Sequence, residues 1–479
     1  MINKKGDVVM KKTKRLLALG LALVMSCTLL AGCGSNKDAA DKNEQGQTVI
    51  NVGGWPDKEG SALDTINARK DRFEQANPDV QIVPDLWKFD RKTFYAKAAG
   101  GQLPMVYNAG VTEIIEIMES GYASDLTDAL KERGYEGKFN PKVLDVITKN
   151  DKIYAFPYAC TVMGLMFNTD LFKEAGLLEE DGTPKQPETW YDVVEFAKII
   201  KEKTGKPGFV MPTAGNSGGW LFTCMAWSFG VDFMEKNADG KWKATFNSPE
   251  AAEALQFFKD MKWKHDILPA NTLIDATEWQ RTFGTGGAGI TFGAGDYPAR
   301  AMNKYGMMPE QIGMLAMAKG PKRYVTLLAG DIYCISPEAT EDQIDAGIRW
   351  IESAYNYNMT EEVKASTLDS LKLCQENNQI IGIKGLSVWA DDTEVVQFQR
   401  QMADEMCNTK PNYVKLYNDF AMDCPAEVQA EEPVCCQELY AILDKCLQEV
   451  LTDENSDPAT VLEKANSDFQ MNYLDNLTY

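Results

Sequence analysis

The stretch MGLMF at residues 163–167, followed by PETWYDVVEFAKIIKEKTG at residues 187–205, indicates most directly how this chain folds. The first segment is a short apolar run typical of a buried strand. In the second segment, Thr189 can cap a helix that begins at Trp190, with the acidic Asp192 at its third position. Apolar side chains then recur at i, i+3, i+4 and i+7 until Gly205 ends the pattern. We therefore predict a strand followed by an amphipathic helix.

The same alternation continues on both sides of that stretch. Short strands are predicted at 49–52, 80–83, 105–107, 209–211, 289–292 and 326–335, and helices at 61–76, after residue 110, from residue 249 and at 341–356. Residues 390–479 are expected to be mostly helical. This order favours an α/β fold with a mostly parallel sheet covered on both faces. Residues 33–479 are too many for one compact core, so we predict two lobes.

The N-terminus has the pattern of a secretory signal peptide. Its first 15 residues contain six Lys or Arg and one Asp, and the uncharged segment Leu16–Leu30 leads to Ala31, Gly32 and Cys33. The apolar segment is shorter than the ~20 residues that a transmembrane helix needs. The end of this segment resembles the bacterial lipobox, which implies cleavage after residue 32 and a lipid on Cys33. The alternative is an ordinary signal peptide with an incidental cysteine. In the lipobox interpretation, residues 33–47 are a lipidated flexible tether.

Composition excludes several classes of function. The net charge is −21, and the segment removed is basic, so the mature chain repels nucleic acid and anionic lipid headgroups. His265 is the only histidine, which excludes most histidine-dependent nucleophilic catalysis and disfavours transition metals. The cysteines after Cys33 form no C-x-x-C pair. We expect no catalytic residue, no metal site and no cofactor.

Several short segments carry a family resemblance. They are FEQANPDV at 73–80, GGQLP at 100–104, IYAFPY at 153–158, LMFNTDLFKEAGL at 165–177, PETW at 187–190 and GGAGI at 286–290. In this order and spacing they resemble segments of the extracellular solute-binding proteins of ABC sugar importers, the maltodextrin-binding-like class. The resemblance extends from about residue 49 to residue 356. Met105 stands where that family usually has an aspartate.

The resemblance implies a two-lobed periplasmic-binding-protein-like α/β fold with the ligand in a cleft between the lobes and a helical C-terminal part. It places the segments that cross between the lobes near 159–163, 328–331 and 385–389. Lobe 1 is then expected to comprise 48–158 with 330–386, and lobe 2 to comprise 159–329 with 387–479. It also implies a non-catalytic monomer whose partners are a small solute and the membrane subunits of an ABC importer.

Candidate ligand contacts are polar and aromatic residues that follow predicted strands or lie in the crossings. A sugar ring has an apolar face and a rim of hydroxyls, so its site needs aromatic surface together with fixed donors and acceptors. For Trp190, Trp242, Trp263 and Trp350 we favour core packing, whereas Trp279 and Trp389 stay open. The candidates are Trp55, Asp57, Glu59, Asn108, Thr161, Asn216, Trp220, Asp296, Tyr297, Asp331 and Tyr333.

We therefore expect a lipid-anchored protein on the extracellular face of the cell membrane that captures a sugar or oligosaccharide for an ABC importer. Alternatives are a binding protein for a peptide or another small polar solute, or a surface enzyme acting on glycosides. The 70 carboxylates supply acidic pairs by chance, but no segment resembles a catalytic motif. An adhesin would show repeats or a β-rich composition, and neither appears.

Overall fold

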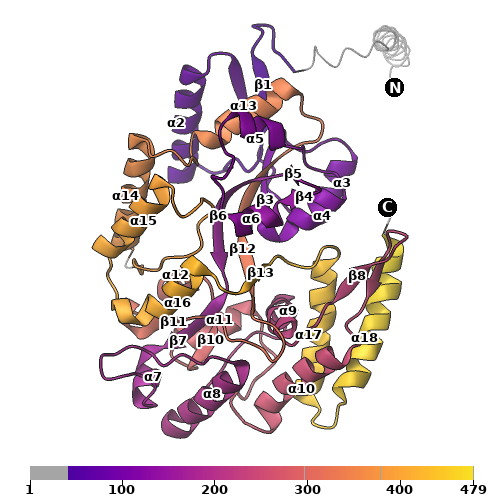
Figure 1. Ribbon diagram of the computed structural model, residues 1–479, viewed down its shortest axis with the longest axis vertical. Coiled ribbons are helices and arrows are strands. Elements are labelled where there is room, and N and C mark those ends of the chain that lie inside the picture. The colour runs from indigo at the N-terminus through magenta and orange to yellow at the C-terminus, as the bar shows by residue number, and fades with distance from the viewer. Residues whose placement is uncertain (1–40, 296, 378, 478–479) are drawn as a thin grey trace, which may run out of the picture.

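The computed structural model describes residues 41–477 apart from 296 and 378, and it has two lobes (Figure 1). Two long strands run through the middle of the molecule, β6 (Phe156–Val162) and β12 (Val325–Ile335). The expectations for Cys33 and Asp296 fall outside the described residues.

A six-stranded sheet extends from the first lobe into the middle of the molecule. Its strand order is β13-β12-β3-β1-β2, and β6 also pairs with β12. β1 is parallel to β2 and β3, whereas β12 is antiparallel to β3 and β6. The other elements of this part are β1 (Thr48–Val52), α2 (Ser61–Ala76), β2 (Val80–Pro84), α3 (Arg91–Ala99), β3 (Val106–Gly110), η2 (Val111–Glu113), α4 (Ile114–Glu119), α5 (Thr127–Glu132), α6 (Pro141–Val146), β4 (Thr148–Lys149), β5 (Lys152–Ile153), α13 (Glu341–Glu352), α14 (Glu361–Glu376), α15 (Glu394–Glu405) and β13 (Glu427–Gln429).

The second lobe contains a three-stranded antiparallel sheet, β10-β7-β11. The prediction of a mostly parallel sheet is wrong here, because β7 (Gly164–Asn168) continues away from β6 while its two neighbours run the opposite way. All five residues of β7 are buried, as expected for a central strand. Around it lie α7 (Thr169–Glu174), α8 (Trp190–Thr204), α9 (Ser217–Ser228), β8 (Met234–Lys236), β9 (Trp242–Ala244), α10 (Pro249–Trp263), α11 (Ala276–Gly284), β10 (Ile290–Gly293), α12 (Tyr297–Tyr305), η3 (Pro309–Gln311), β11 (Ile312–Leu315), α16 (Pro411–Asp423), α17 (Cys436–Thr452), α18 (Pro458–Asn472) and η4 (Leu474–Asn476).

The predicted helix α8 is confirmed together with its signals. Thr189 and Asp192 form a reciprocal capping box, and Gly205 ends the helix at φ 70°. The strand predicted at 209–211 is wrong, because only one bridge forms there, between Phe209 and Ile290.

Helix α9 was not predicted, since its sequence SGGWLFTCMAWS shows no polar stripe. The helix is buried almost all round. Its N-terminus is satisfied from a distance, because the carboxylate of Asp444 accepts the backbone N–H groups of Asn216 at 2.6 Å and Gly219 at 2.7 Å.

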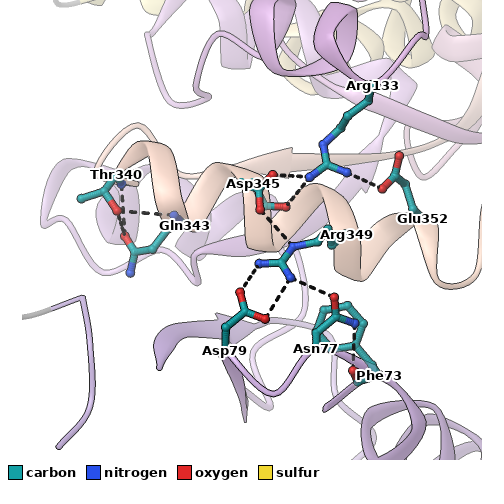
Figure 2. A network of polar contacts seen from close by, with 9 residues as sticks. All are labelled: Phe73, Asn77, Asp79, Arg133, Thr340, Gln343, Asp345, Arg349 and Glu352. Atoms are coloured by element: carbon teal, nitrogen blue, oxygen red, sulfur yellow. Dashed lines mark hydrogen bonds and ion pairs between the residues drawn. The ribbon is translucent and has the colours of Figure 1, made fainter. Parts of the chain in front are cut away.

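Helix α13 is held to the first lobe by a network of charged groups (Figure 2). Arg349 pairs with Asp79 at 2.7 Å and with Asp345 at 2.9 Å. Asp345 also pairs with Arg133, whose other nitrogen lies 2.7 Å from Glu352. Because the carboxylate of Asp345 is shared by two arginines, the network fixes α13 against both α5 and the start of β2.

Residues 388–396 contact the first lobe, although the expected boundary at residue 386 assigned them to the second. Val388, Trp389, Val395 and Val396 are buried in the hydrophobic cluster of the first lobe. The ring of Trp389 stacks on Phe139 with centroids 5.3 Å apart. Burial of these apolar side chains accounts for the difference from the expectation.

Two further observations concern the described residues as a whole. Within them, no helix has the length and apolar character needed to cross a membrane. The cysteines from Cys160 to Cys446 are present as free thiols, five of them buried.

Candidate functional site

Two paired strands carry the chain between the lobes. β6 enters the second lobe with only Met163 between it and β7, and β12 returns antiparallel to β6. The strands approach closely at Gly330, where φ is 155° and an added Cβ would lie 2.2 Å from the carbonyl oxygen of Ala159. Only glycine fits this position.

A cavity of about 600 Å³ lies beside these strands, on the side of the second lobe. Its volume is in the range that holds a small solute. The polar and aromatic residues that line it come from β6, β12, α9, α12 and α16, and they are Thr161, Trp220, Tyr297, Arg300, Asp331 and Tyr417. Four of the predicted site residues are therefore brought together here, namely Thr161, Trp220, Tyr297 and Asp331.

Thr161 is fixed by a short chain of hydrogen bonds. The hydroxyl of the buried Tyr417 donates to the carbonyl oxygen of Val162 at 2.8 Å. The Thr161 hydroxyl lies 3.2 Å from the Tyr417 hydroxyl and accepts the N–H of Gly295 at 3.2 Å. Since the Tyr417 proton is already engaged, Thr161 donates to Tyr417. These bonds tie the crossing strand to α16 and to the loop before α12.

Tyr297 gives the cavity a rigid aromatic wall. Its ring packs edge to face on Trp279 at 5.5 Å, and the indole N–H of Trp279 donates to Thr291 at 2.6 Å. The guanidinium of Arg300 lies 5.0 Å from the centroid of the Tyr297 ring, within cation–π range. Among the described residues, the charged side chains that line the cavity are Arg300 and Asp331.

Trp220 lies in the first turn of α9 and reaches the cavity from there. Close packing fixes this end of the helix, since a Cβ added at Gly219 would lie 2.3 Å from the carbonyl oxygen of Tyr440. The indole nitrogen of Trp220 is buried and has no hydrogen-bond partner among the described residues. Trp220 therefore contributes the surface of its ring to the cavity, while its indole N–H is covered by the surrounding protein.

Asn108 and Tyr333 lie opposite each other on β3 and β12, beyond the end of the cavity. Asp331 precedes Tyr333 by two residues and therefore points to the same face of the strand. The ring of Tyr333 contacts Tyr158 with centroids 4.7 Å apart. Asn108 and Tyr333 therefore do not line the cavity, and they lie on the side of it that faces the first lobe.

Trp55, Asp57 and Glu59 do not line this cavity. Trp55 is 2% exposed, stacks on Trp350 at 5.9 Å and donates from its indole nitrogen to Asn67 at 3.2 Å. Its ring is therefore part of the core of the first lobe. Asp57 and Glu59 are exposed in the loop before α2.

Asn216 faces a second hollow of about 640 Å³, between α3 and α4 of the first lobe and α9 and α17 of the second. Arg91 lies in this hollow and pairs with Glu113 and with Glu116. Burial raises the pKa of Glu113, although Arg91 opposes that effect. The polar groups here are largely engaged with one another.

Sequence analysis missed several residues of the cavity and its rim. Arg300 lies one turn after Tyr297 on α12, so helical spacing from a predicted contact would have indicated it. Tyr417 lines the cavity from α16, and Tyr355 packs on Tyr158 with ring centroids 4.7 Å apart. Neither residue follows a predicted strand or lies in a predicted crossing. The sequence carries no local signal for either.

Comparison with known proteins gives a consistent picture. The model of the family described as bacterial extracellular solute-binding protein matches residues 57–345, more than half of the chain. The chain is 27% identical over 283 residues to the sn-glycerol-3-phosphate-binding periplasmic protein UgpB of Escherichia coli. That match covers 56% of this chain and 58% of the relative, so the chain spans less than two thirds of the relative's length.

Solved structures agree in fold at low sequence identity. The cyclic alpha-maltosyl-1,6-maltose binding protein of Arthrobacter globiformis superposes with a TM-score of 0.62 at 18% identity, over 88% of this chain and 98% of that one. UgpB of Mycobacterium tuberculosis, solved with glycerophosphocholine, gives a TM-score of 0.63 at 16% identity, over 89% and 98% of the two chains. The predicted two-lobed periplasmic-binding-protein-like fold is confirmed.

Proposed function

Because the chain belongs to the bacterial extracellular solute-binding protein family, we propose that it captures a sugar or oligosaccharide outside the cell and delivers it to the membrane subunits of an ABC importer. The observation that carries this proposal is the cavity beside the crossing strands, which combines the aromatic side chains of Trp220 and Tyr297 with polar groups such as Asp331. A sugar ring needs both an aromatic face and fixed polar groups.

Binding is proposed to close the two lobes about β6 and β12. The lobes already touch at the far edge, where Lys236 of β8 pairs with Glu119 of α4 at 2.6 Å. A solute favours a closed form only by the difference between its affinities for the two forms. Contacts made by both lobes supply that difference.

A glycerophosphate-like solute is the second candidate. Arg300 on the cavity wall offers a cation for a phosphate, and the Escherichia coli relative is named for binding sn-glycerol 3-phosphate. Asp331 on the same wall opposes an anion, so we favour the neutral sugar. We propose that the protein binds its solute without chemical change and acts as a monomer.

A thermal-shift screen of residues 34–479 tests the function. We expect at least one mono- or oligosaccharide to raise the unfolding temperature more than sn-glycerol 3-phosphate or a dipeptide does. A solute at one hundred times its Kd stabilises the folded form by about 2.7 kcal/mol. Chromatography after overnight incubation should recover that sugar intact. Turnover of an excess into shorter sugars would instead establish an enzyme, and a shift only with dipeptides would establish a different solute class.

We also propose that Cys33 anchors the protein by lipid to the extracellular face of the membrane. The lipobox resemblance at residues 30–33 motivates this. Cys33→Ala should move the full chain from the membrane fraction to the soluble fraction in cell fractionation. Without this cysteine no acyl chains are attached at this site, and stable anchoring needs more than one acyl chain. Cys27→Ala, in the apolar part of the same signal segment, is the matched control and should stay with the membrane. Equal membrane retention of the Cys33 variant would refute the anchor.

A further inference from the structure

Three tyrosines form a compact patch on the first lobe. The ring of Tyr158 lies 4.7 Å from Tyr333 and 4.7 Å from Tyr355, measured between centroids. Tyr333 and Tyr355 are 6.0 Å apart. These distances describe a triangle and not a column, and all three side chains are half-buried. The rings therefore present a patch of aromatic surface to solvent.

A buried layer holds the patch in place. The guanidinium of Arg69 lies 3.9 Å from the ring of Trp350 and 6.0 Å from the ring of Tyr355. Trp350 in turn stacks on the buried Trp55. Arg69 also donates to the hydroxyl of Ser353 at 2.9 Å. A rigid aromatic surface loses little conformational entropy when a ligand binds to it.

The patch adjoins the cavity wall along two strands. Asp331 and its partner Ala159 line the cavity, and Tyr333 and Tyr158 are close neighbours on the same strands. A bulge between Asp331 and Ile332 displaces this part of the ladder. Two residues along a strand span about 7 Å, which is comparable with one sugar unit. A chain of rings that begins in the cavity therefore reaches the tyrosines with its next unit.

We propose that Tyr158, Tyr333 and Tyr355 form a second ring-binding subsite, so that the solute is a glycoside of at least two rings. This inference rests on the proposed sugar-binding function. The first ring occupies the cavity against Trp220 and Tyr297, and the second lies on the tyrosines of the opposite lobe. Asp331 stands at the junction, where it accepts hydrogen bonds from sugar hydroxyls and repels a phosphate. A solute that touches both patches bridges the lobes.

The test compares sugars that differ by one ring. Isothermal titration of residues 34–479 would use xylose, glucose and N-acetylglucosamine with their β-1,4 or α-1,4 di- and trisaccharides, and sn-glycerol 3-phosphate. Tyr355→Ala should weaken binding of di- and trisaccharides by about tenfold or more and leave the monosaccharide within about twofold. Trp220→Ala should weaken every member of the series that binds. Tyr355→Phe, which keeps the ring, should stay near wild type and shows that the position tolerates substitution.

Tyr191→Ala is the matched control, because Tyr191 is 49% exposed on α8, away from the cavity lining. It should bind every sugar as wild type does. An equal loss for one-ring and three-ring sugars in the Tyr355 variant, or no loss, would overturn the subsite while leaving sugar capture in place. Wild-type binding of sn-glycerol 3-phosphate and of none of the sugars would also overturn it, and would shift the function to the second candidate. Absence of all sugar binding rejects the inference, whatever the wider solute screen gives.

Discussion

Replacing Trp220 with alanine is expected to weaken solute binding by roughly thirty-fold to a thousand-fold. The indole forms part of the cavity wall, and its ring offers an apolar surface on which a sugar ring can pack. Loss of a large aromatic anchor commonly costs about 2 to 4 kcal/mol of binding free energy. Isothermal titration with the best solute from the thermal-shift screen measures the change in Kd.

Two further variants separate the contributions of Trp220. Trp220→Phe keeps a smaller aromatic face, so its Kd should fall between wild type and the alanine variant. Trp263→Ala removes a tryptophan that is 37% exposed and donates to the carbonyl oxygen of Val450, outside the cavity, and it should bind as wild type does. Circular dichroism should be unchanged in all three proteins. Wild-type affinity in the Trp220→Ala variant would show that the solute binds outside this cavity. The hollow beside Arg91 would then be the next candidate site.

Small-angle scattering adds a test of closure that affinity alone does not give. Wild type should contract when the solute is added, because the lobes rotate about the two crossing strands. Trp220→Ala should contract only at proportionally higher solute concentration. A wild-type profile that does not change at saturation would argue against closure.

The parts of the fold that sequence analysis predicted are those with local signals. The capping box at Thr189 and the apolar stripe after it mark α8 within the sequence itself. Helix α9 has no such signal, because it is buried almost all round and its N-terminus is satisfied by Asp444, more than two hundred residues away. The order of the strands in the antiparallel sheet likewise depends on where the chain crosses between lobes and not on local propensity.

For the candidate site, the sequence signal does not separate residues that line the cavity from residues that pack in the core. Residues next to the crossings, such as Thr161 and Asp331, were predicted and do line the cavity. Trp55 followed a strand in a glycine-rich loop and carried the same signal, yet it packs in the core on Trp350. Composition and loop position cannot separate these two outcomes, because the packing partner comes from α13, some three hundred residues later in the chain.

Replacing the buried acid Glu432 with glutamine is expected to stabilise the protein at alkaline pH. Burial raises the pKa of Glu432 from 4.5 to about 7, although its carboxylate accepts the indole N–H of Trp227 at 2.8 Å. Nearby Asp232 raises that pKa further, whereas Arg323 lowers it. The folded protein therefore binds a proton more tightly than the unfolded chain does, and its stability falls as pH rises from about 4.5 to about 7. The full difference is about 3 kcal/mol.

Glutamine keeps an oxygen for Trp227 and carries no charge at any pH, so it removes the loss of stability that Glu432 causes between about pH 4.5 and about pH 7. In urea unfolding, Glu432→Gln should match wild type near pH 5 and exceed it at pH 8.5 by up to about 3 kcal/mol. Glu431 keeps some of the pH dependence in the variant, because burial also raises its pKa to about 7. Glu454→Gln changes the net charge equally on the exposed surface and should not alter the pH profile. A variant with the same decline in stability from pH 5 to pH 8.5 as wild type would mean that Glu432 is already ionised at pH 5 in the folded protein, held by Trp227 and Arg323 against its burial.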